Sequence, residues 1–384
     1  MDLIENKFYQ RNVTLIPEDS EYFEYDLSSL DYPGNMTHLP KWEIAIKITF
    51  YSFIIISSVV GNCLLFLVIA RTKPLQTTTN FFLVNLAVSD LLVISCCSWV
   101  RLVDDLTEGW VLGNVFCKLN SFAQVTSMVA GIFSLVLIAC DRFFGIVFAM
   151  KAHIIERRAS YAIVITWVCA IAVASPLLFV RQEESRVWAN HVEIWCDDIW
   201  PITEEVDPVT GSIMKSFKGR KAYYMFVTVA LYFVPILTMS VIYILIILTV
   251  WFTRAPGERI SVKEIQVQNK VKRKVVIMLI TILATFGLCW LPLEIVILYS
   301  EYRPNQHEQL PHWYSILEFV SYTLAFANSA LNPLIYAGFN ENFRKGFRAL
   351  FGNNERKFYA AIYRADSMYH TSTTHVMTTQ HTQL

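Results

Sequence analysis

The chain has 384 residues, of which 54% are apolar and only 17% are charged, and its formal net charge is zero. This composition is typical of membrane proteins and excludes an ordinary soluble domain. The balanced total hides a segregation, because residues 1–42 contain eight acids and three bases, whereas the segments 254–274 and 340–357 are basic.

Seven apolar stretches follow one another at residues 49–70, 81–100, 129–140, 162–180, 225–251, 275–298 and 314–339. A helix needs about 20 mostly apolar residues to cross a bilayer. The third stretch reaches that length if it extends from Cys117 to Val147. Because backbone groups in hydrocarbon must be paired within their own segment, the stretches should be helices. We therefore predict an all-α membrane protein with a seven-transmembrane helix bundle over residues 44–338 and its termini on opposite sides.

The charge segregation predicts the orientation of the bundle. An excess of lysine and arginine marks the cytoplasmic side, so the basic segments lie inside the cell and the N-terminus lies outside. The N-terminal tail, residues 1–43, carries two glycosylation sequons, at Asn12 and Asn35. Sequons are used only on exported segments. A multi-pass location in the plasma membrane follows.

The eight cysteines divide by position. Those inside the apolar stretches are expected to be small buried residues; they are Cys63, Cys96, Cys97, Cys140, Cys169 and Cys289. Cys117 and Cys196 fall on the extracellular side, where oxidising conditions permit a disulfide bond. Such a bond would hold the loop between the fourth and fifth helices over the bundle.

An amphipathic eighth helix is predicted at residues 339–352, after the last span. Phe343, Phe347 and Leu350 recur there at helical spacing among basic residues, a pattern typical of a helix that lies on the inner leaflet. The remaining tail, residues 353–384, is polar and is predicted to be disordered.

Each apolar stretch also carries a characteristic motif. The motif residues are Gly61-Asn62, Asn85 to Asp90, Trp110, Gly113, Cys117, Asp141-Arg142-Phe143, Trp167, Pro176, Pro235, Tyr243, Phe286, Cys289 to Pro292 and Asn332 to Tyr336. In these positions the chain resembles the rhodopsin-like family of G-protein-coupled receptors over about residues 45–351. The resemblance implies a receptor that activates heterotrimeric G proteins, with no enzymatic activity and no cofactor. It also implies receptor kinase and arrestin as partners of the serine- and threonine-rich tail.

The resemblance further assigns a set of switching residues. They are Asp90, Ile132, Asp141, Arg142, Pro235, Tyr243, Phe286, Trp290, Pro292, Asn328, Asn332, Pro333 and Tyr336. Asp90 and Asn332 mark a place where the family binds sodium, but the usual serine is replaced by Gly131. A buried polar cluster with water is the alternative to a sodium site.

Arg142 and Met150 are implied as G-protein contacts. In the family this arginine pairs with the neighbouring acid, here Asp141, until activation releases it. An acid at the base of the sixth helix often helps, but Lys272 stands there. We therefore expect Asp141 to hold Arg142 alone and basal activity to be appreciable. Ala149 also replaces the usual proline of the second inner loop.

The ligand class follows from two departures. Gln124 stands where amine receptors carry an aspartate, and Phe326 stands where retinal receptors carry a lysine. The chain looks most like the receptors for neuropeptide FF, orexin and RFamide peptides, which implies a peptide ligand. The rival functions are a lipid or small-molecule receptor on the same fold and, from another class, a transporter or channel.

The extracellular segments are rich in acids, namely Asp104, Asp105, Glu108, Glu193, Asp197, Asp198, Glu204, Glu205 and Asp207. They would attract a cationic ligand; the alternative is a solvated acidic rim. Related receptors place an acid at the position of Glu301 to bind a ligand arginine through a charge-assisted hydrogen bond. The ligand is therefore predicted to be basic and amidated.

Two charges lie deeper, and an intramembrane charge is a candidate functional residue. Arg101 either contacts the ligand or neutralises an acid such as Glu294 or Glu318 across the pocket. The complete predicted ligand wall consists of Arg101, Asp105, Gln124, Asp197, Thr228, Glu294, Glu301, Phe319 and Tyr322.

Overall fold

A computed structural model describes residues 27–32, 39–107, 109–148, 159–206, 213–252, 262–303 and 312–351. Several predicted features lie outside these residues: the glycosylation sites Asn12 and Asn35, the G-protein contact Met150, Ala149, Glu108, Asp207 and the tail 353–384.

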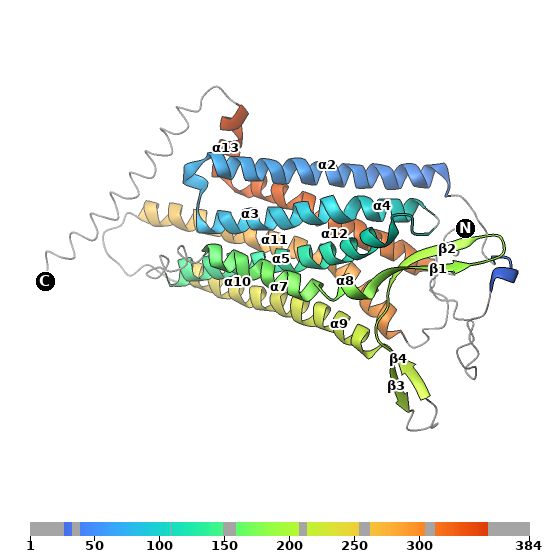
Figure 1. The fold of residues 1–384 in the computed structure, drawn as a ribbon. Coiled ribbons are helices and arrows are strands. Elements are labelled where there is room, and N and C mark those ends of the chain that lie inside the picture. The colour runs from blue at the N-terminus through green and yellow to red at the C-terminus, as the bar shows by residue number, and fades with distance from the viewer. Residues whose placement is uncertain are drawn as a thin grey trace.

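The described chain is a bundle of long helices that run side by side (Figure 1). In chain order they are α2 (Lys41–Arg71), α3 (Thr78–Val93) with α4 (Trp99–Leu106), α5 (Gly113–Val147), α7 (Ala159–Ala174) with α8 (Leu177–Val180), α9 (Lys218–Thr228) with α10 (Val234–Phe252), α11 (Val262–Tyr302) and α12 (His312–Phe339). Single π-helical turns, Ile94–Ser98 and Val229–Phe233, join α3 to α4 and α9 to α10. The short helix α13 (Glu341–Phe351) follows α12.

Six of these helical segments in the described chain are long and apolar enough to cross a membrane. The last segment, α12, is 28 residues long but is more polar. Its polar side chains, among them Asn328, Ser329 and Asn332, are buried inside the bundle. A spanning helix can carry such residues when they face other helices rather than lipid. The fold therefore agrees with the seven predicted spans.

The outer surface of the bundle is apolar. Leu67, Val164 and Leu288 are exposed there, as expected for side chains that contact lipid. The same surface corrects the prediction for two cysteines, since Cys63 and Cys169 are exposed rather than buried. Position inside an apolar stretch does not decide burial, because in a membrane both faces of a helix are apolar.

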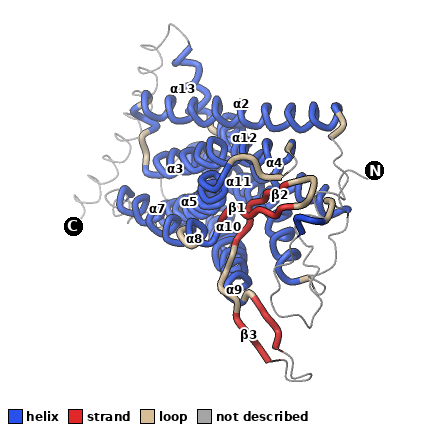
Figure 2. Tube along the Cα trace, turned by 45° about the vertical axis from the view of Figure 1, so that its right-hand side comes forward, coloured by secondary structure: helices blue, strands red, loops and turns tan. Residues whose placement is uncertain are grey.

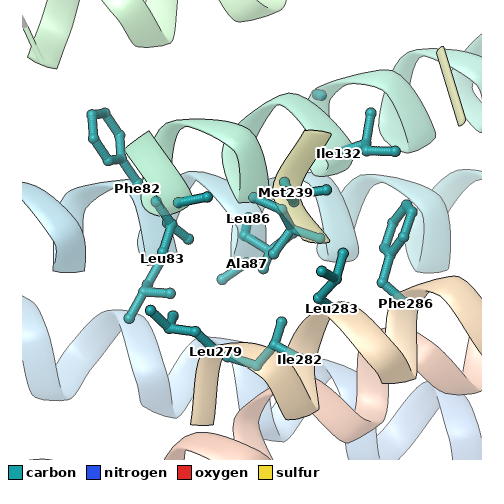
Figure 3. Close-up of a cluster of buried hydrophobic side chains, with 14 of the residues drawn as sticks. Phe82, Leu83, Leu86, Ala87, Ile132, Met239, Leu279, Ile282, Leu283 and Phe286 are labelled. Atoms are coloured by element: carbon teal, nitrogen blue, oxygen red, sulfur yellow. The ribbon is translucent and has the colours of Figure 1, made fainter. Parts of the chain in front are cut away.

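The interior is a close-packed apolar core between the helices. Figure 3 shows Phe82 and Leu86 of α3 gathered with Ile132 of α5, Met239 of α10 and Phe286 of α11. Hydrogen bonds tie α7, α3 and α5 together at another point. The indole of Trp167 donates to Asn85 (2.8 Å), and Asn85 donates to Ser134 (2.8 Å).

One glycine is required by close helix packing. A Cβ atom at Gly61 of α2 would lie 2.9 Å from the ring of Pro333, so α2 and α12 approach each other there as only a glycine permits.

A β-hairpin crosses one end of the bundle. Strand β1 (Arg181–Val187) pairs antiparallel with β2 (Val192–Asp198). The predicted disulfide joins Cys117 of α5 to Cys196 of β2 and holds the hairpin in place. Figure 2 shows these strands in red at one end of the helices. We call this the hairpin end, and the opposite end, which carries Arg142, the Arg142 end.

Two further contacts surround the hairpin. A second hairpin, β3 (Thr203–Val206) with β4 (Ile213–Ser216), precedes α9. A short turn near the N-terminus, Leu27–Ser29, is followed by residues that pack on β1 and β2. There the amide of Ala189 donates to the carbonyl of Leu30, and the ring of Tyr32 contacts Trp188 edge to face.

Candidate functional site: a charged cavity at the hairpin end

A cavity of about 880 Å³ opens between the helices at the hairpin end. Its wall includes most of the predicted ligand residues, namely Arg101, Asp105, Gln124, Asp197, Glu301, Phe319 and Tyr322. These residues come from α4, α5, β2, α11 and α12, so the site forms only when the bundle is folded.

Thr228 and Glu294 do not belong to the cavity wall. Both are buried, and the Thr228 hydroxyl donates to the Glu294 carboxylate, which links α9 to α11 inside the bundle. The helical spacing correctly placed Glu294 on the inner face, but the side chain turns toward α9 rather than toward the cavity.

Arg101 is the centre of one charged cluster. Its guanidinium lies 3.0 Å from Asp105, 3.5 Å from Asp104 and 3.5 Å from Glu318, and it stacks over the ring of Tyr322 at 4.3 Å. The internal neutralisation that the sequence allowed is therefore made with Glu318, and Glu294 takes no part in it. Arg101 still lines the cavity.

A second cluster lies on the other side of the cavity. Arg220 of α9 contacts Glu301 of α11 at 2.8 Å and Asp198 of β2 at 3.6 Å. Arg181 lies 3.5 Å from Asp198 and 3.7 Å from Asp197. Burial alone would raise the pKa of Asp198, but the guanidinium groups of Arg181 and Arg220 outweigh it and hold the pKa below its ordinary value.

These clusters change the interpretation of the acidic segments. The acids near the cavity are neither a free negative field nor a solvated rim, because Asp104, Asp105, Asp197, Asp198 and Glu301 each contact an arginine. Glu193, away from the cavity, accepts from the Trp188 indole (3.1 Å), and burial raises its pKa.

Arg101 and Glu318 were among the candidate residues, but the two arginines of the second cluster were not predicted from the sequence. Arg181 and Arg220 both line the cavity. A signal was present, because Arg181 directly follows the fourth apolar stretch and Arg220 comes shortly before the fifth. Basic residues at these ends of the spans run against the acidic character of that side, and such exceptions point to internal ion pairs.

Most of the predicted switching residues are buried inside the bundle. Asp90 accepts hydrogen bonds from Ser329 (2.9 Å) and Asn332 (2.8 Å). Trp290 stacks on Phe286 with 5.9 Å between ring centroids, and Ile132 is fully buried. Pro235, Tyr243 and Tyr336 are buried as well, and Pro292 and Pro333 lie inside α11 and α12.

The oxygens around Asp90 suit a hard cation. The side-chain carbonyl oxygens of Asn62, Asn328 and Asn332 are buried without a hydrogen-bond donor. Oxygen atoms of this kind are the ligands that such ions prefer. A Cβ atom at Gly131 would lie 3.5 Å from the Ser89 hydroxyl and 3.6 Å from Leu86, both of α3.

At the Arg142 end, Arg142 pairs with Asp141 at 2.6 Å. The expectation that Asp141 holds Arg142 alone is wrong, because the hydroxyl of Thr79 in α3 contacts both side chains. A further ion pair joins α11 to α13, between Lys274 and Glu341 (2.7 Å). The hydrogen bond and charge of Lys274 lower the pKa of Glu341.

Comparisons with known proteins agree with this architecture. Residues 61–336 match the family of 7 transmembrane receptors (rhodopsin family). Neuropeptide FF receptor 2 of Mus musculus is 32% identical over 351 residues, covering 88% of this chain and 80% of that receptor. The substance-P receptor of Rattus norvegicus is 28% identical over 337 residues, covering 88% and 78%. The chain therefore belongs to the rhodopsin family of seven-transmembrane receptors.

Proposed function

We propose that this multi-pass membrane protein is a plasma-membrane receptor for an extracellular, basic and amidated peptide, and that it activates heterotrimeric G proteins. The observation that carries the proposal is the charge of the cavity. In the described chain, seven carboxylates line it against four lysine and arginine side chains. A cavity with excess negative charge favours a cationic ligand.

The relatives support a peptide ligand, since their names refer to neuropeptide FF and to substance P. The alternative function, a receptor for a lipid, would need a largely apolar cavity without charges. This wall carries Arg101, Arg181 and Arg220 together with their acids. The rival of a transporter or channel gains no support from these relatives.

The proposed orientation places the hairpin end outside the cell. The tail 1–43, with its sequons at Asn12 and Asn35, would then be extracellular, and α13 with the tail 353–384 would be cytoplasmic. The Cys117–Cys196 disulfide at the hairpin end supports this orientation, because disulfides persist in oxidising compartments.

Signalling requires that the ligand bind one state of the bundle better than the other. Pro292 removes a backbone hydrogen bond inside α11 and so supplies a hinge about which the Arg142 end of this helix can move. That movement would open a cleft in which Arg142, released from Asp141 and Thr79, meets the G protein together with Met150. Arrestin and a receptor kinase would act on the tail.

A sodium ion held by Asp90, Asn332 and neighbouring amide oxygens would neutralise the buried carboxylate. The side chains of Ser329 and Asn332 would then tie Asp90 of α3 to α12 in the inactive state.

The test is a screen of amidated basic peptides on cells that express the full chain, read by calcium and by cyclic AMP. Glu301→Gln should weaken an arginine-bearing agonist by about 1.5–3 kcal/mol, because a charge-assisted hydrogen bond is lost. Glu184→Gln is the matched control, since Glu184 lies in β1 and does not line the cavity. An unchanged agonist potency in Glu301→Gln would remove Glu301 from the site.

A further inference from the structure

The acid predicted to bind a ligand arginine is already bound by an arginine of the receptor. Nε of Arg220 lies 2.8 Å from Oε1 of Glu301, within hydrogen-bonding distance. The Glu301 side chain is only 7% exposed, whereas that of Arg220 is 28% exposed. Both side chains line the cavity, and the guanidinium of Arg220 occupies the position at Glu301 that a ligand guanidinium would need.

The Arg220–Glu301 contact reduces the free-energy cost of a largely buried acidic binding site. A carboxylate removed from water is costly unless a counter-ion accompanies it. Arg220 supplies that counter-ion to Glu301 and orients its carboxylate before a ligand arrives.

Arg220 also lies close to two other acids. Asp198 lies 3.6 Å and Asp197 lies 3.9 Å from its guanidinium. If Arg220 lost Glu301, these two acids would still neutralise it, so its displacement leaves no unpaired charge. A ligand guanidinium that reaches Glu301 restores the counter-ion there at the same time.

A neutral ligand group cannot make the same exchange, because it does not replace the positive charge that Arg220 supplies to Glu301. We propose that Arg220 is a resident occupant of the guanidinium subsite at Glu301, and that a ligand arginine displaces it onto Asp197 and Asp198. Arg220 is thus a specificity-determining residue of the receptor. This inference rests on the proposed function, because it requires a basic ligand.

The exchange also affects how α9 and α11 are held together at the hairpin end. Arg220 belongs to α9 and Glu301 to α11, and beside this pair the Tyr302 hydroxyl of α11 donates to the carbonyl of Lys221 in α9 (3.0 Å). When a ligand contact replaces the Arg220–Glu301 contact, α11 loses one of its contacts with α9. Helix α11 is the one that carries the Pro292 hinge. Recognition of the guanidinium is therefore coupled to the helix that moves on activation.

The experiment measures binding of two dipeptide amides, arginyl-phenylalanine amide and citrullyl-phenylalanine amide, to the full-length receptor. Citrulline has nearly the shape of arginine without its charge, so the ratio of the two affinities reports on the guanidinium subsite alone. Arg220→Gln should raise the arginine-to-citrulline affinity ratio by about tenfold over the wild type, because the internal competitor is gone and Glu301 no longer has the charge of Arg220 beside it.

Two controls separate this effect from general damage at the hairpin end. Arg186→Gln removes an arginine of β1 that does not line the cavity, and it should leave the ratio unchanged. Arg220→Gln combined with Glu301→Gln should bring the ratio close to one. If Arg220→Gln does not reach the cell surface, Arg220→Lys keeps the charge, loses the fork of donors and should raise the ratio by a smaller factor.

The outcomes distinguish the inference from the proposed function. A wild-type preference for arginine that Arg220→Gln leaves unchanged or lowers overturns the inference and leaves the basic ligand standing. Equal binding of both dipeptides in the wild type and in Arg220→Gln overturns both. A preference that appears only in Arg220→Gln supports both, since Arg220 then masks the subsite in the wild type.

Discussion

The two ends of the bundle hold their charges in different ways. At the hairpin end, Arg101 and Arg220 each contact three acids, and the Arg101 side chain is only 14% exposed. At the Arg142 end, Arg142 contacts one acid and one hydroxyl, and the Lys274 side chain is 60% exposed. Buried multiple pairs are costly to break, whereas single exposed pairs are not. The first arrangement shapes a binding cavity, and the second suits contacts that must break during switching.

The largest expected effect is on the hairpin end. Arg101→Gln should destabilise the receptor by about 3–5 kcal/mol, because it leaves largely buried acids without their counter-ion. The apparent melting temperature of the purified receptor measures this. Arg186→Gln is the control. Arg186 lies in β1, and its guanidinium is 3.8 Å from Glu193, a longer distance than any in the Arg101 cluster. Equal melting temperatures for the two variants would show that the Arg101 cluster is not a buried network of the kind described.

A smaller effect is expected from the pair that holds Arg142. Asp141→Asn should raise ligand-free signalling by about tenfold, because Arg142 loses its charged partner and is released more easily. Thr79→Val should raise it by a smaller factor, since it removes a neutral hydroxyl from the same group. G-protein activation without ligand is the measurement. Basal signalling that stays at the wild-type level in Asp141→Asn would contradict the restraint.

The exposed pair between α11 and α13 should have a weaker effect. Lys274→Glu should raise ligand-free signalling by less than about fivefold, because an exposed ion pair is a weak restraint and is screened by salt. The exchange of both charges, Lys274→Glu with Glu341→Lys, should return it to the wild-type level. Failure of the double variant to recover would show that the pair itself is not the restraint.

The smallest effect is expected from mild acid at the hairpin end. The pKa of Asp198 is lowered in the folded receptor, so its contribution to stability is present above its unfolded pKa of about 3.9 and is lost only as pH falls through the lower folded value. Amide hydrogen exchange of β2, corrected for its intrinsic pH dependence, should therefore not increase between pH 7.5 and pH 5.5. Increased exchange at pH 5.5 would show that Asp198 is protonated in this range.

Some of the site could be read directly from the chain. Gln124, Phe319 and Tyr322 were predicted on the ligand wall, Gln124 from its place in the receptor family, and all three line the cavity. The helical period placed Glu294 on the inner face but could not say which neighbour it meets. Its partner, Thr228, lies 66 residues away along the chain, and nothing in the local pattern connects them.

The sequence by itself determined the membrane class and the helical spans, because apolar length is a local property of the chain, and its motifs assigned the switching residues through the resemblance to the receptor family. Only the tertiary structure decided which charges meet. Arg220 and Glu301 are separated by 81 residues, and Arg101 and Glu318 by 217. Ion pairs depend on distances across the folded bundle, so they turned an apparently free acidic surface into a cavity whose acids are already held by the arginines of the receptor.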